Sequence, residues 1–375
     1  MQSKRQPKVH TYSKKRRRKV RPGRAILSIG FTFLVAGVIG VVGYSVAKPI
    51  LQYSGAEHSQ TQPEETLSSA AAETAYPITV TDQSGREVTI EKEPERIVSG
   101  YYIPSSLLIA LGLKDKIVGI EAKADKRPVY SLAAPQLTEL PSVGSAKDFD
   151  LETCASLSPD LVILPLKLKD AAQSLTELQI PVLLVNPESQ ELLESMIGLI
   201  STATDTEEPA AELLAYIDEQ TAMLSDALAD VETPEVYLAG NSSLLSTAGE
   251  AMYQSSLIKL AGGKNAASEI SDTYWADISY EQLLAWDPSY IILASDAQYT
   301  VDDVLNDANL KDCTAVKNGD VYAIPGEVEA LDSPVPASIL ASVWLAGILH
   351  PEQVAPDTYT QEKTSYYETF YGIQE

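Results

Sequence analysis

The chain has 375 residues, of which 45% are apolar, so it is long enough for two domains with ordinary hydrophobic cores. Eleven of its 28 Lys and Arg residues lie within residues 1–24, where there is no Asp or Glu. The other 17 are set against 52 acidic residues, which leaves residues 25–375 with a net charge of −35. This acidic body argues against nucleic acid as a partner, because proteins that bind nucleic acid present basic surfaces to phosphate.

A long uncharged segment follows the basic run. Residues 25–47 are 23 residues without a charge, between Arg24 and Lys48, and a membrane-spanning helix needs about 20 apolar residues. Basic residues ahead of such a helix hold the N-terminus in the cytoplasm. We therefore predict a single-pass transmembrane anchor, with residues 1–24 as a basic cytoplasmic segment and the rest of the chain outside the cell membrane. The alternative is a signal peptide cleaved after Ala47, which would give a secreted protein.

The composition changes again after the anchor. Residues 48–75 are rich in Ser, Gln, Glu, Thr and Ala and have no hydrophobic period, which is typical of a flexible tether. Order is predicted to begin near Tyr76. Alternating apolar residues at Ile78–Thr81 and at residues 88–90, with Gly85 between them, predict a β-hairpin.

Short apolar strands then alternate with helices. The predicted strands are at residues 96–99, 117–120, 161–164, 182–185, 236–239 and 321–324, and the predicted helices are at residues 105–113, 171–178, 255–261 and 336–349. Uninterrupted apolar strands are expected where both faces of a sheet are covered. The alternation predicts an α/β fold with mainly parallel sheets.

One pattern occurs twice, 129 positions apart. FDLETCASLSPDLVIL occupies residues 149–164, and ISYEQLLAWDPSYIIL occupies residues 278–293. Each combines an acidic residue in the first turn of a helix, an apolar helical face, a proline and a buried strand. The repeat predicts two similar lobes, at residues 76–205 and 232–375. Between them, the apolar stripe of residues 207–230 predicts a helix of about 36 Å, assigned to a bridging segment at residues 206–231.

Four segments resemble the periplasmic-binding proteins for iron complexes and vitamin B12. They are TVTDQSGREVTIEKEPERIVSG, SSLLIALGLKDKIVGI, the doubled E-x(6)-P-D/S-x-I/V-I-L unit and VPASILASVWLAGILHPE. The resemblance covers residues 76–375. It implies two Rossmann-like lobes joined by a rigid helix. It also implies a substrate-binding component of an ABC importer for an iron complex (siderophore or haem) or a corrinoid, with the permease and its ATPase as partners. Members of this family are usually lipid-anchored or secreted, so the predicted transmembrane anchor is a departure.

Glu152 and Glu281 occupy equivalent positions in the two repeats, next to the candidate helix caps Asp150 and Ser279. The residues alone favour a local role, since an acidic side chain in a first turn complements the helix dipole. The family resemblance implies another role, in which one Glu on each lobe docks onto basic residues of the permease. Exposed charge pairs of this kind set orientation and encounter rate more than affinity.

Ligand contacts are expected from loops that leave the carboxyl ends of the strands, where open α/β sheets form their crevice. Tyr and Trp side chains there suit large flat or chelated ligands, and lysines suit anionic ligands. The candidates are Tyr101, Tyr102, Pro104, Lys167 and Lys169 in the first lobe, and Asn241, Ser242, Tyr274, Trp275, Asp296 and Glu327 in the second.

The histidines and cysteines limit the chemistry. His10, His58 and His350 are the only histidines, and none lies on a predicted cleft loop, so a site for a bare transition metal and a Ser-His or Cys-His catalytic arrangement both lack support. No phosphate-binding loop or dinucleotide fingerprint occurs. We therefore predict a non-enzyme without a cofactor, whose ligand is a preformed complex or an organic molecule.

Several alternatives stay open at this stage. The ligand could instead be a metal oxyanion, and the protein could be a membrane-anchored ligand sensor or surface protein. Cys154 and Cys313, one in each predicted lobe, could form a disulfide or be two buried thiols.

Overall fold

The computed structural model describes residues 76–271, 273 and 275–374. The predicted cytoplasmic segment, anchor and tether, at residues 1–24, 25–47 and 48–75, lie outside the described residues. Among the described residues, no helix combines the length and the apolar character that crossing a membrane requires.

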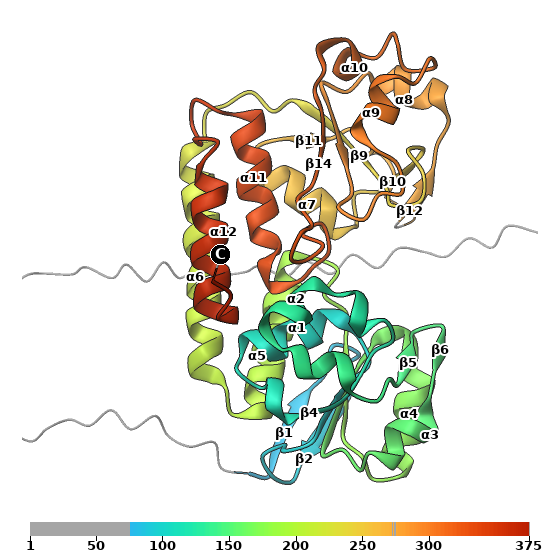
Figure 1. Cartoon of the computed structure of the whole chain (residues 1–375), viewed down its shortest axis with the longest axis vertical. Coiled ribbons are helices and arrows are strands. Elements are labelled where there is room, and N and C mark those ends of the chain that lie inside the picture. Colours follow the sequence, from blue (N-terminus) through green and yellow to red (C-terminus); the bar gives the residue numbers. More distant parts are fainter. Residues whose placement is uncertain (1–75, 272, 274, 375) are drawn as a thin grey trace, which may run out of the picture. The chain divides into compact units, whose positions relative to one another are not determined.

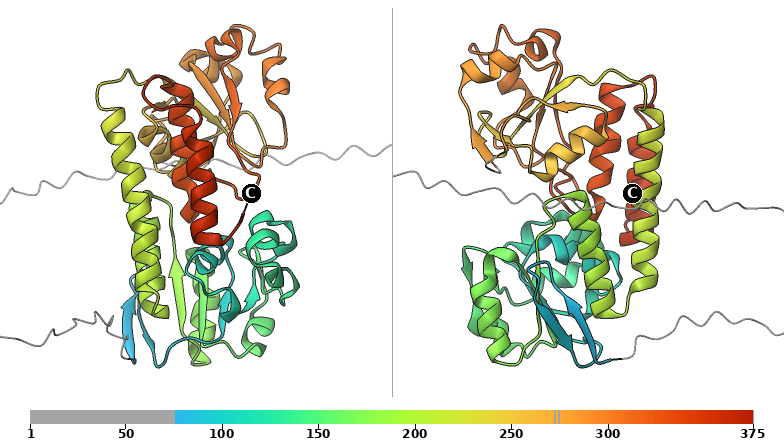
Figure 2. Two further views of the ribbon diagram at one scale, coloured as in Figure 1. Left: turned by 60° about the vertical axis from the view of Figure 1, so that its left-hand side comes forward. Right: turned by 180° about the vertical axis from the view of Figure 1, so that it is seen from behind.

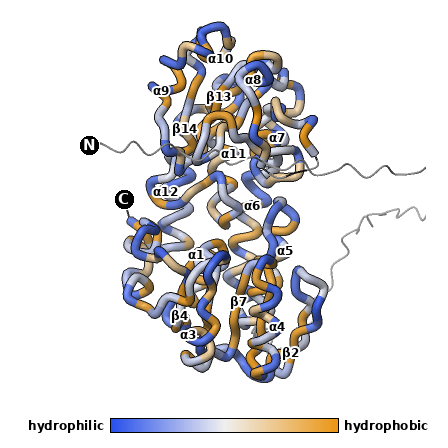
Figure 3. Tube along the Cα trace, turned by 90° about the vertical axis from the view of Figure 1, so that its right-hand side faces the viewer, coloured by the Kyte–Doolittle hydropathy of each residue, from blue (hydrophilic) through white to orange (hydrophobic). Residues whose placement is uncertain are grey.

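The first lobe, which contains β4 in Figure 1, is built on a parallel sheet with the strand order β4-β3-β7-β8. Its strands are β3 (Ile97–Ser99), β4 (Ile117–Ile120), β7 (Leu161–Pro165) and β8 (Val182–Val185). Alternate residues of β7 point to opposite faces: Leu161 and Ile163 join one buried cluster, while Val162 and Leu164 join another. Because both faces are covered, β7 is apolar throughout, as Figure 3 shows.

The second lobe has its own sheet, with the strand order β12-β10-β9-β13-β14 and β11 beside β9. The strands are β9 (Glu235–Ala239), β10 (Ser246–Ala248), β11 (Lys264–Asn265), β12 (Trp275–Asp277), β13 (Tyr290–Leu293) and β14 (Val321–Ala323). Strands β11, β9, β13 and β14 are parallel, whereas β10 and β12 are antiparallel to their neighbours. The α/β class predicted from the sequence is therefore confirmed.

The two repeats form the same helix–strand unit in different sheets. Helix α3 (Leu151–Ser156) leads into β7, and helix α8 (Tyr280–Trp286) leads into β13. Each helix is capped by the predicted side chain. Asp150 Oδ1 accepts a hydrogen bond from the Thr153 amide at 2.9 Å, and Ser279 Oγ accepts one from the Gln282 amide at 3.2 Å.

Two small antiparallel pairs complete the first lobe. The predicted hairpin is present as β1 (Ile78–Thr81) and β2 (Glu87–Ile90), paired in register from Ile78–Ile90 to Thr81–Glu87. Its turn contains Gly85 with a φ of +82°, a conformation that favours glycine. The second pair is β5 (Gly144–Ser145) with β6 (Asp148–Phe149).

The long helix between the lobes is α6 (Glu207–Ala227), whose 21 residues correspond to roughly 32 Å. It follows α5 (Gln190–Thr204) after Asp205, which has a left-handed backbone conformation. Helices α11 (Ile339–Leu349) and α12 (Thr358–Tyr371) lie beside α6 (Figures 1 and 2). The Glu362 carboxylate of α12 accepts hydrogen bonds from Tyr216 and Gln220 of α6, at 2.9 and 3.0 Å.

Helix α12 also reaches the first lobe. The Tyr371 and Ser106 hydroxyls, from α12 and α1 (Tyr102–Ala110), are hydrogen-bonded at 2.7 Å. The lobes are thus connected by α6 and by the C-terminal helix, which the sequence analysis did not include. The other helices are α2 (Pro128–Ala133), α4 (Lys169–Glu177), α7 (Tyr253–Leu260), α9 (Val301–Leu305) and α10 (Thr314–Asn318).

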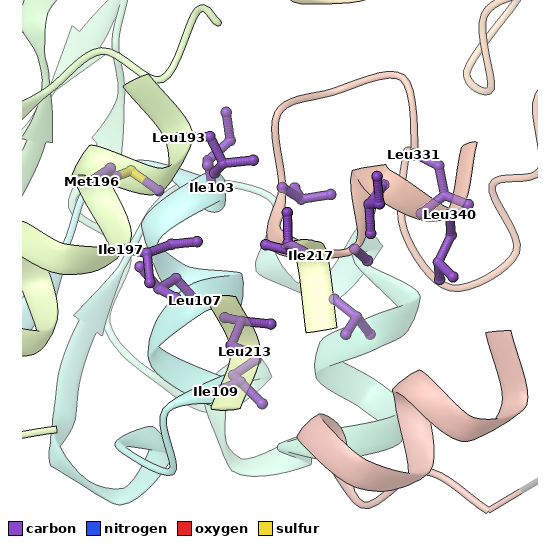
Figure 4. Packing of buried hydrophobic residues seen from close by; sticks show 14 of the residues in the cluster. Ile103, Leu107, Ile109, Leu193, Met196, Ile197, Leu213, Ile217, Leu331 and Leu340 are labelled. Carbon is purple, nitrogen blue, oxygen red and sulfur yellow. The ribbon is translucent and has the colours of Figure 1, made fainter. Parts of the chain in front are cut away.

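One buried apolar cluster extends through both lobes. It includes Ile103 and Leu107 of α1, Leu213 and Ile217 of α6, and Leu340 of α11, which Figure 4 shows from close by. The two cysteines lie elsewhere, each unpaired and buried in a cluster of its own lobe.

Candidate ligand-binding cleft

Two neighbouring cavities lie where the loops of the two lobes face each other. The Trp275 cavity, of about 510 Å³, is lined by Tyr101 and Glu188 from the first lobe and by Asn241, Ser242 and Trp275 from the second. Tyr101, Glu188 and Asn241 follow the carboxyl ends of β3, β8 and β9, as expected for an open α/β sheet. A Cβ at Gly240 would come within 2.7 Å of the Trp275 ring, so glycine lets the ring lie against the backbone.

The Arg127 cavity, of about 310 Å³, adjoins the first. It is lined by Tyr102, Lys123, Lys126, Arg127, Tyr130, Asp296, Gly326, Val328 and Glu329, among others. The rings of Tyr101 and Tyr102, one in each cavity, have centroids 5.4 Å apart in an edge-to-face arrangement. The lobes also meet directly here, since the Val129 amide donates a hydrogen bond of 3.1 Å to the Val328 carbonyl.

Arg127 is one of the cationic residues that line this second cavity. Its guanidinium carbon lies 4.1 Å from the centroid of the Tyr102 ring, a cation–π distance. Its Nε is buried and has no hydrogen-bond partner among the described residues. A fixed guanidinium of this kind is suited to a carboxylate or another oxyanion, which it can bind through two parallel hydrogen bonds.

Three buried carboxyl groups lie in or beside the two cavities, and none forms an ion pair with Arg127 in the described part of the chain. Glu121 accepts hydrogen bonds of 2.7 Å from Ser105 and from Tyr130. The Tyr367 hydroxyl lies 3.5 Å from Glu329, and Ser295 donates to Asp332. Burial raises the pKa of all three carboxyl groups, that of Glu329 to about 7.

Residues 97–328 match the sequence model of the periplasmic binding protein family. The chain belongs to this family. Periplasmic binding proteins of this kind are substrate-binding components of ABC transporters, so the resemblance drawn from the sequence is confirmed.

Individual periplasmic binding proteins are similar along most of the chain. The molybdate-binding protein MolA of Haemophilus influenzae is 24% identical over 319 residues, which cover 78% of this chain and 90% of MolA. A cobalamin-binding protein of Halobacterium salinarum is 25% identical over 288 residues, covering 74% of this chain and 75% of that protein.

Solved structures show the same fold. A periplasmic solute binding protein from Veillonella parvula has a TM-score of 0.69 at 28% identity, over 80% of this chain and 94% of that one. MolA bound to molybdate has a TM-score of 0.71 at 23% identity, over 80% of this chain and 99% of MolA.

The predicted ligand residues divide into two groups in this periplasmic binding protein. Tyr101, Asn241, Ser242 and Trp275 line the Trp275 cavity, and Tyr102 and Asp296 line the Arg127 cavity. The others line neither of these cavities: Pro104 is buried within α1, while Lys167, Lys169 and Glu327 are exposed. Tyr274 lies outside the described residues.

Several cleft residues were missed by the sequence analysis. Arg127, Lys123 and Lys126 lie in the loop that follows β4. The strand-end rule, applied to β4 as it was to β3, would have found them. Gln254 and Asp332 carried no comparable signal, because neither follows a strand directly.

The raised pKa of Glu329 has a consequence for stability. Between its ordinary pKa of 4.5 and its folded-state pKa of about 7, the folded chain binds a proton that the unfolded chain releases. Wild-type stability should therefore fall as the pH rises through this range. The Glu329→Gln variant lacks the effect, so it should match the wild type near pH 4.5 and exceed it by roughly 3 kcal/mol above pH 8.

Urea unfolding at the two pH values measures this difference. Glu327→Gln, at an exposed neighbouring position, makes the same chemical change and is the control. An equal difference between Glu329→Gln and the wild type at both pH values would show that Glu329 titrates normally.

Proposed function

We propose that this chain is the extracytoplasmic substrate-binding component of an ABC importer whose cargo is a metal complex with anionic groups. Iron–siderophore, haem and corrinoid complexes are the candidate cargoes. The observation that carries the proposal is the guanidinium of Arg127, which lies over Tyr102 in a cavity between the two lobes and whose buried Nε has no hydrogen-bond partner among the described residues. The function is binding and delivery rather than catalysis.

Arg127 supports an anionic cargo for an energetic reason. A buried N–H without a partner costs about 1–3 kcal/mol, and an anionic oxygen that accepts from it recovers this free energy. The neighbouring Lys123 adds positive charge at the same cavity. This local positive charge contrasts with the net negative charge of residues 25–375, so an anionic group of a cargo would be attracted here rather than elsewhere on the protein.

The size and lining of the cleft favour a whole complex over a single small ion. Cavities of about 310 and 510 Å³ fall in the range of about 300–1,000 Å³ that is typical of sites for organic ligands. Tyr101, Tyr102 and Trp275 offer aromatic faces with polar edges, which suit a large flat or chelated ligand.

A metal oxyanion is the second candidate cargo. The similarity to the molybdate-binding protein MolA, over 90% of that protein's length, favours it. Arg127 could bind an oxyanion as well as a carboxylate, so the guanidinium alone does not distinguish the two.

Docking to the permease is proposed for Glu152 and Glu281. Both are exposed in first turns of equivalent helices, and neither forms an ion pair within the described residues. Two carboxylates, one on each lobe, would orient the protein on basic residues of a permease. The ATPase associated with that permease would then drive import of the cargo.

The anchor at residues 25–47 is proposed to hold the protein at the outer side of the cell membrane. Its support is the run of 23 uncharged residues behind a basic segment. Together with the tether at residues 48–75, it would raise the effective concentration of the receptor near its permease. Alkaline extraction of membranes tests this: an anchored chain stays with the pellet, and a cleaved chain is released.

Replacing Arg127 tests the cargo site. Arg127→Ala should weaken binding of an anionic cargo about tenfold to a hundredfold, because hydrogen bonds to charged groups are worth about 1.5–3 kcal/mol. Arg127→Lys should recover little of this, because an ammonium lacks the planar fork. Titration calorimetry with ferric siderophores, haem, cyanocobalamin and molybdate gives the affinities.

Lys126→Ala is the matched control, because Lys126 lines the same cavity but is exposed and paired with Asp125 at 2.8 Å. It should change affinity only slightly. Unchanged affinity in Arg127→Ala would remove Arg127 from the binding site.

Charge reversal tests the docking surface. The double variant Glu152→Lys/Glu281→Lys should abolish most uptake while leaving cargo affinity unchanged, because both side chains lie outside the two cavities. Cellular uptake of labelled cargo and calorimetry on the purified protein measure the two effects separately.

Glu212→Lys/Glu219→Lys on the exposed face of α6 makes the same change in net charge and should leave uptake intact. If the Glu152/Glu281 variant lost affinity for cargo instead, the two residues would belong to the binding site.

A further inference from the structure

A second buried polar atom without a partner lies at the other end of the cleft. Gln254, in the first turn of α7, lines the Trp275 cavity with only 5% of its surface exposed. Its Nε2 donates a hydrogen bond of 2.8 Å to the Asp332 carbonyl. Its Oε1 is buried and has no hydrogen-bond partner among the described residues.

The orientation of this amide follows from its partner. The Asp332 carbonyl oxygen can only accept a hydrogen bond, so the amide nitrogen of Gln254 must face it. The atom left unpaired is therefore Oε1, which is an acceptor. A buried acceptor without a donor is unfavourable, and a ligand that supplies the donor removes the penalty.

The residues around Gln254 also favour a ligand that donates a hydrogen bond. Glu188 and Asp332 line the same cavity, and the Asp332 backbone carbonyl beside Gln254 is itself an acceptor, so Gln254 Oε1 adds a second acceptor at this end of the cleft. The hydroxyls of Ser246 and Ser333 also line it, yet neither donates to Gln254 Oε1. The Arg127 cavity has the opposite character, because its unpaired group is a donor.

We propose that Gln254 determines cargo specificity, by requiring an N–H or O–H donor on the part of the cargo that enters the Trp275 cavity. This rests on the proposed function and narrows it. The selected cargo is a metal complex that carries amide or hydroxyl donors together with an anionic group for Arg127. A fully deprotonated oxyanion such as molybdate presents only acceptor oxygens, which the acceptors around Gln254 disfavour.

The chain offers a matched control for this role. Gln220 of α6 is also 5% exposed, and its Oε1 is likewise buried and unpaired within the described residues. Its Nε2 donates to Glu362, and it lines neither cleft cavity. Gln220→Met thus removes the same chemical group outside the cleft.

The test measures the affinity of the full chain in detergent for three kinds of probe. Cyanocobalamin and a ferric trihydroxamate with secondary amides carry N–H donors, while molybdate carries none. Gln254→Met should weaken binding of the donor-bearing probes tenfold or more and leave molybdate affinity unchanged or improved. Gln220→Met should leave every affinity within twofold of the wild type.

A second measurement needs no substitution in the protein. The wild type should bind the secondary-amide ferric complex at least tenfold more tightly than a counterpart whose amide nitrogens are methylated. This comparison decides the matter even if Gln254→Met does not fold.

The inference is overturned if the wild type binds both ferric complexes equally, or prefers molybdate to every donor-bearing probe. It is also overturned if a folded Gln254→Met chain loses affinity for all probes alike. Absence of binding to any probe would instead contradict the proposed function, and this inference with it.

Discussion

The apolar contact of α6 with both lobes is the constraint on which the cleft depends. Leu213 and Ile217 of α6 are fully buried in a cluster that also contains Leu107 of the first lobe and Leu340 beside the second. Separating the lobes would expose such side chains, each at a cost of about 1.5–3 kcal/mol. These contacts therefore oppose a change in the separation of the lobes, and helices α11 and α12 add to this connection.

A fixed separation explains why the cleft contains polar groups without partners. Arg127 Nε and Gln254 Oε1 are both buried and have no hydrogen-bond partner in the described part of the chain, although carboxyl and hydroxyl groups line the same cavities. In a flexible junction the lobes would shift until these groups met protein partners, because an unsatisfied buried group is costly. A stiff junction instead keeps the donor at one end and the acceptor at the other available for a ligand. Binding then requires little rearrangement, which favours affinity.

The sequence contained most of the information on the local elements. Strand 161–164 was predicted to within a residue, and Asp150 was predicted to cap the helix before it, because a continuous apolar run and a capping side chain are local signals. The bridging helix was predicted to extend to residue 230, but it ends at Ala227, and Leu228 is its C-cap residue. Helix α12 was not predicted at all. Its tyrosines pack on α6 and α1 and have no clear apolar period, so tertiary contacts determine this helix.

The site was predicted less completely than the fold. The strand-end rule identifies the edge of a sheet where ligands bind, but not the direction of each side chain. It selected Tyr101 and Asn241, which line the cleft, and also Lys167 and Lys169, which are exposed outside both cavities. Gln254 depends on contacts between distant segments, since its amide meets the carbonyl of Asp332, 78 positions away. Such a contact leaves no pattern in a single sequence.

The stiffness of the junction is tested most directly by the distance between the two lobes in solution. Spin labels are attached at Glu152→Cys and Glu281→Cys, in a chain whose Cys154 and Cys313 are replaced by Ala. Double electron–electron resonance then measures the distance between the two labels. One narrow distance distribution, the same before and after addition of a bound cargo, is the expected result. Two populations in the cargo-free protein, or a large shift on binding, would contradict the account of a cleft formed in advance.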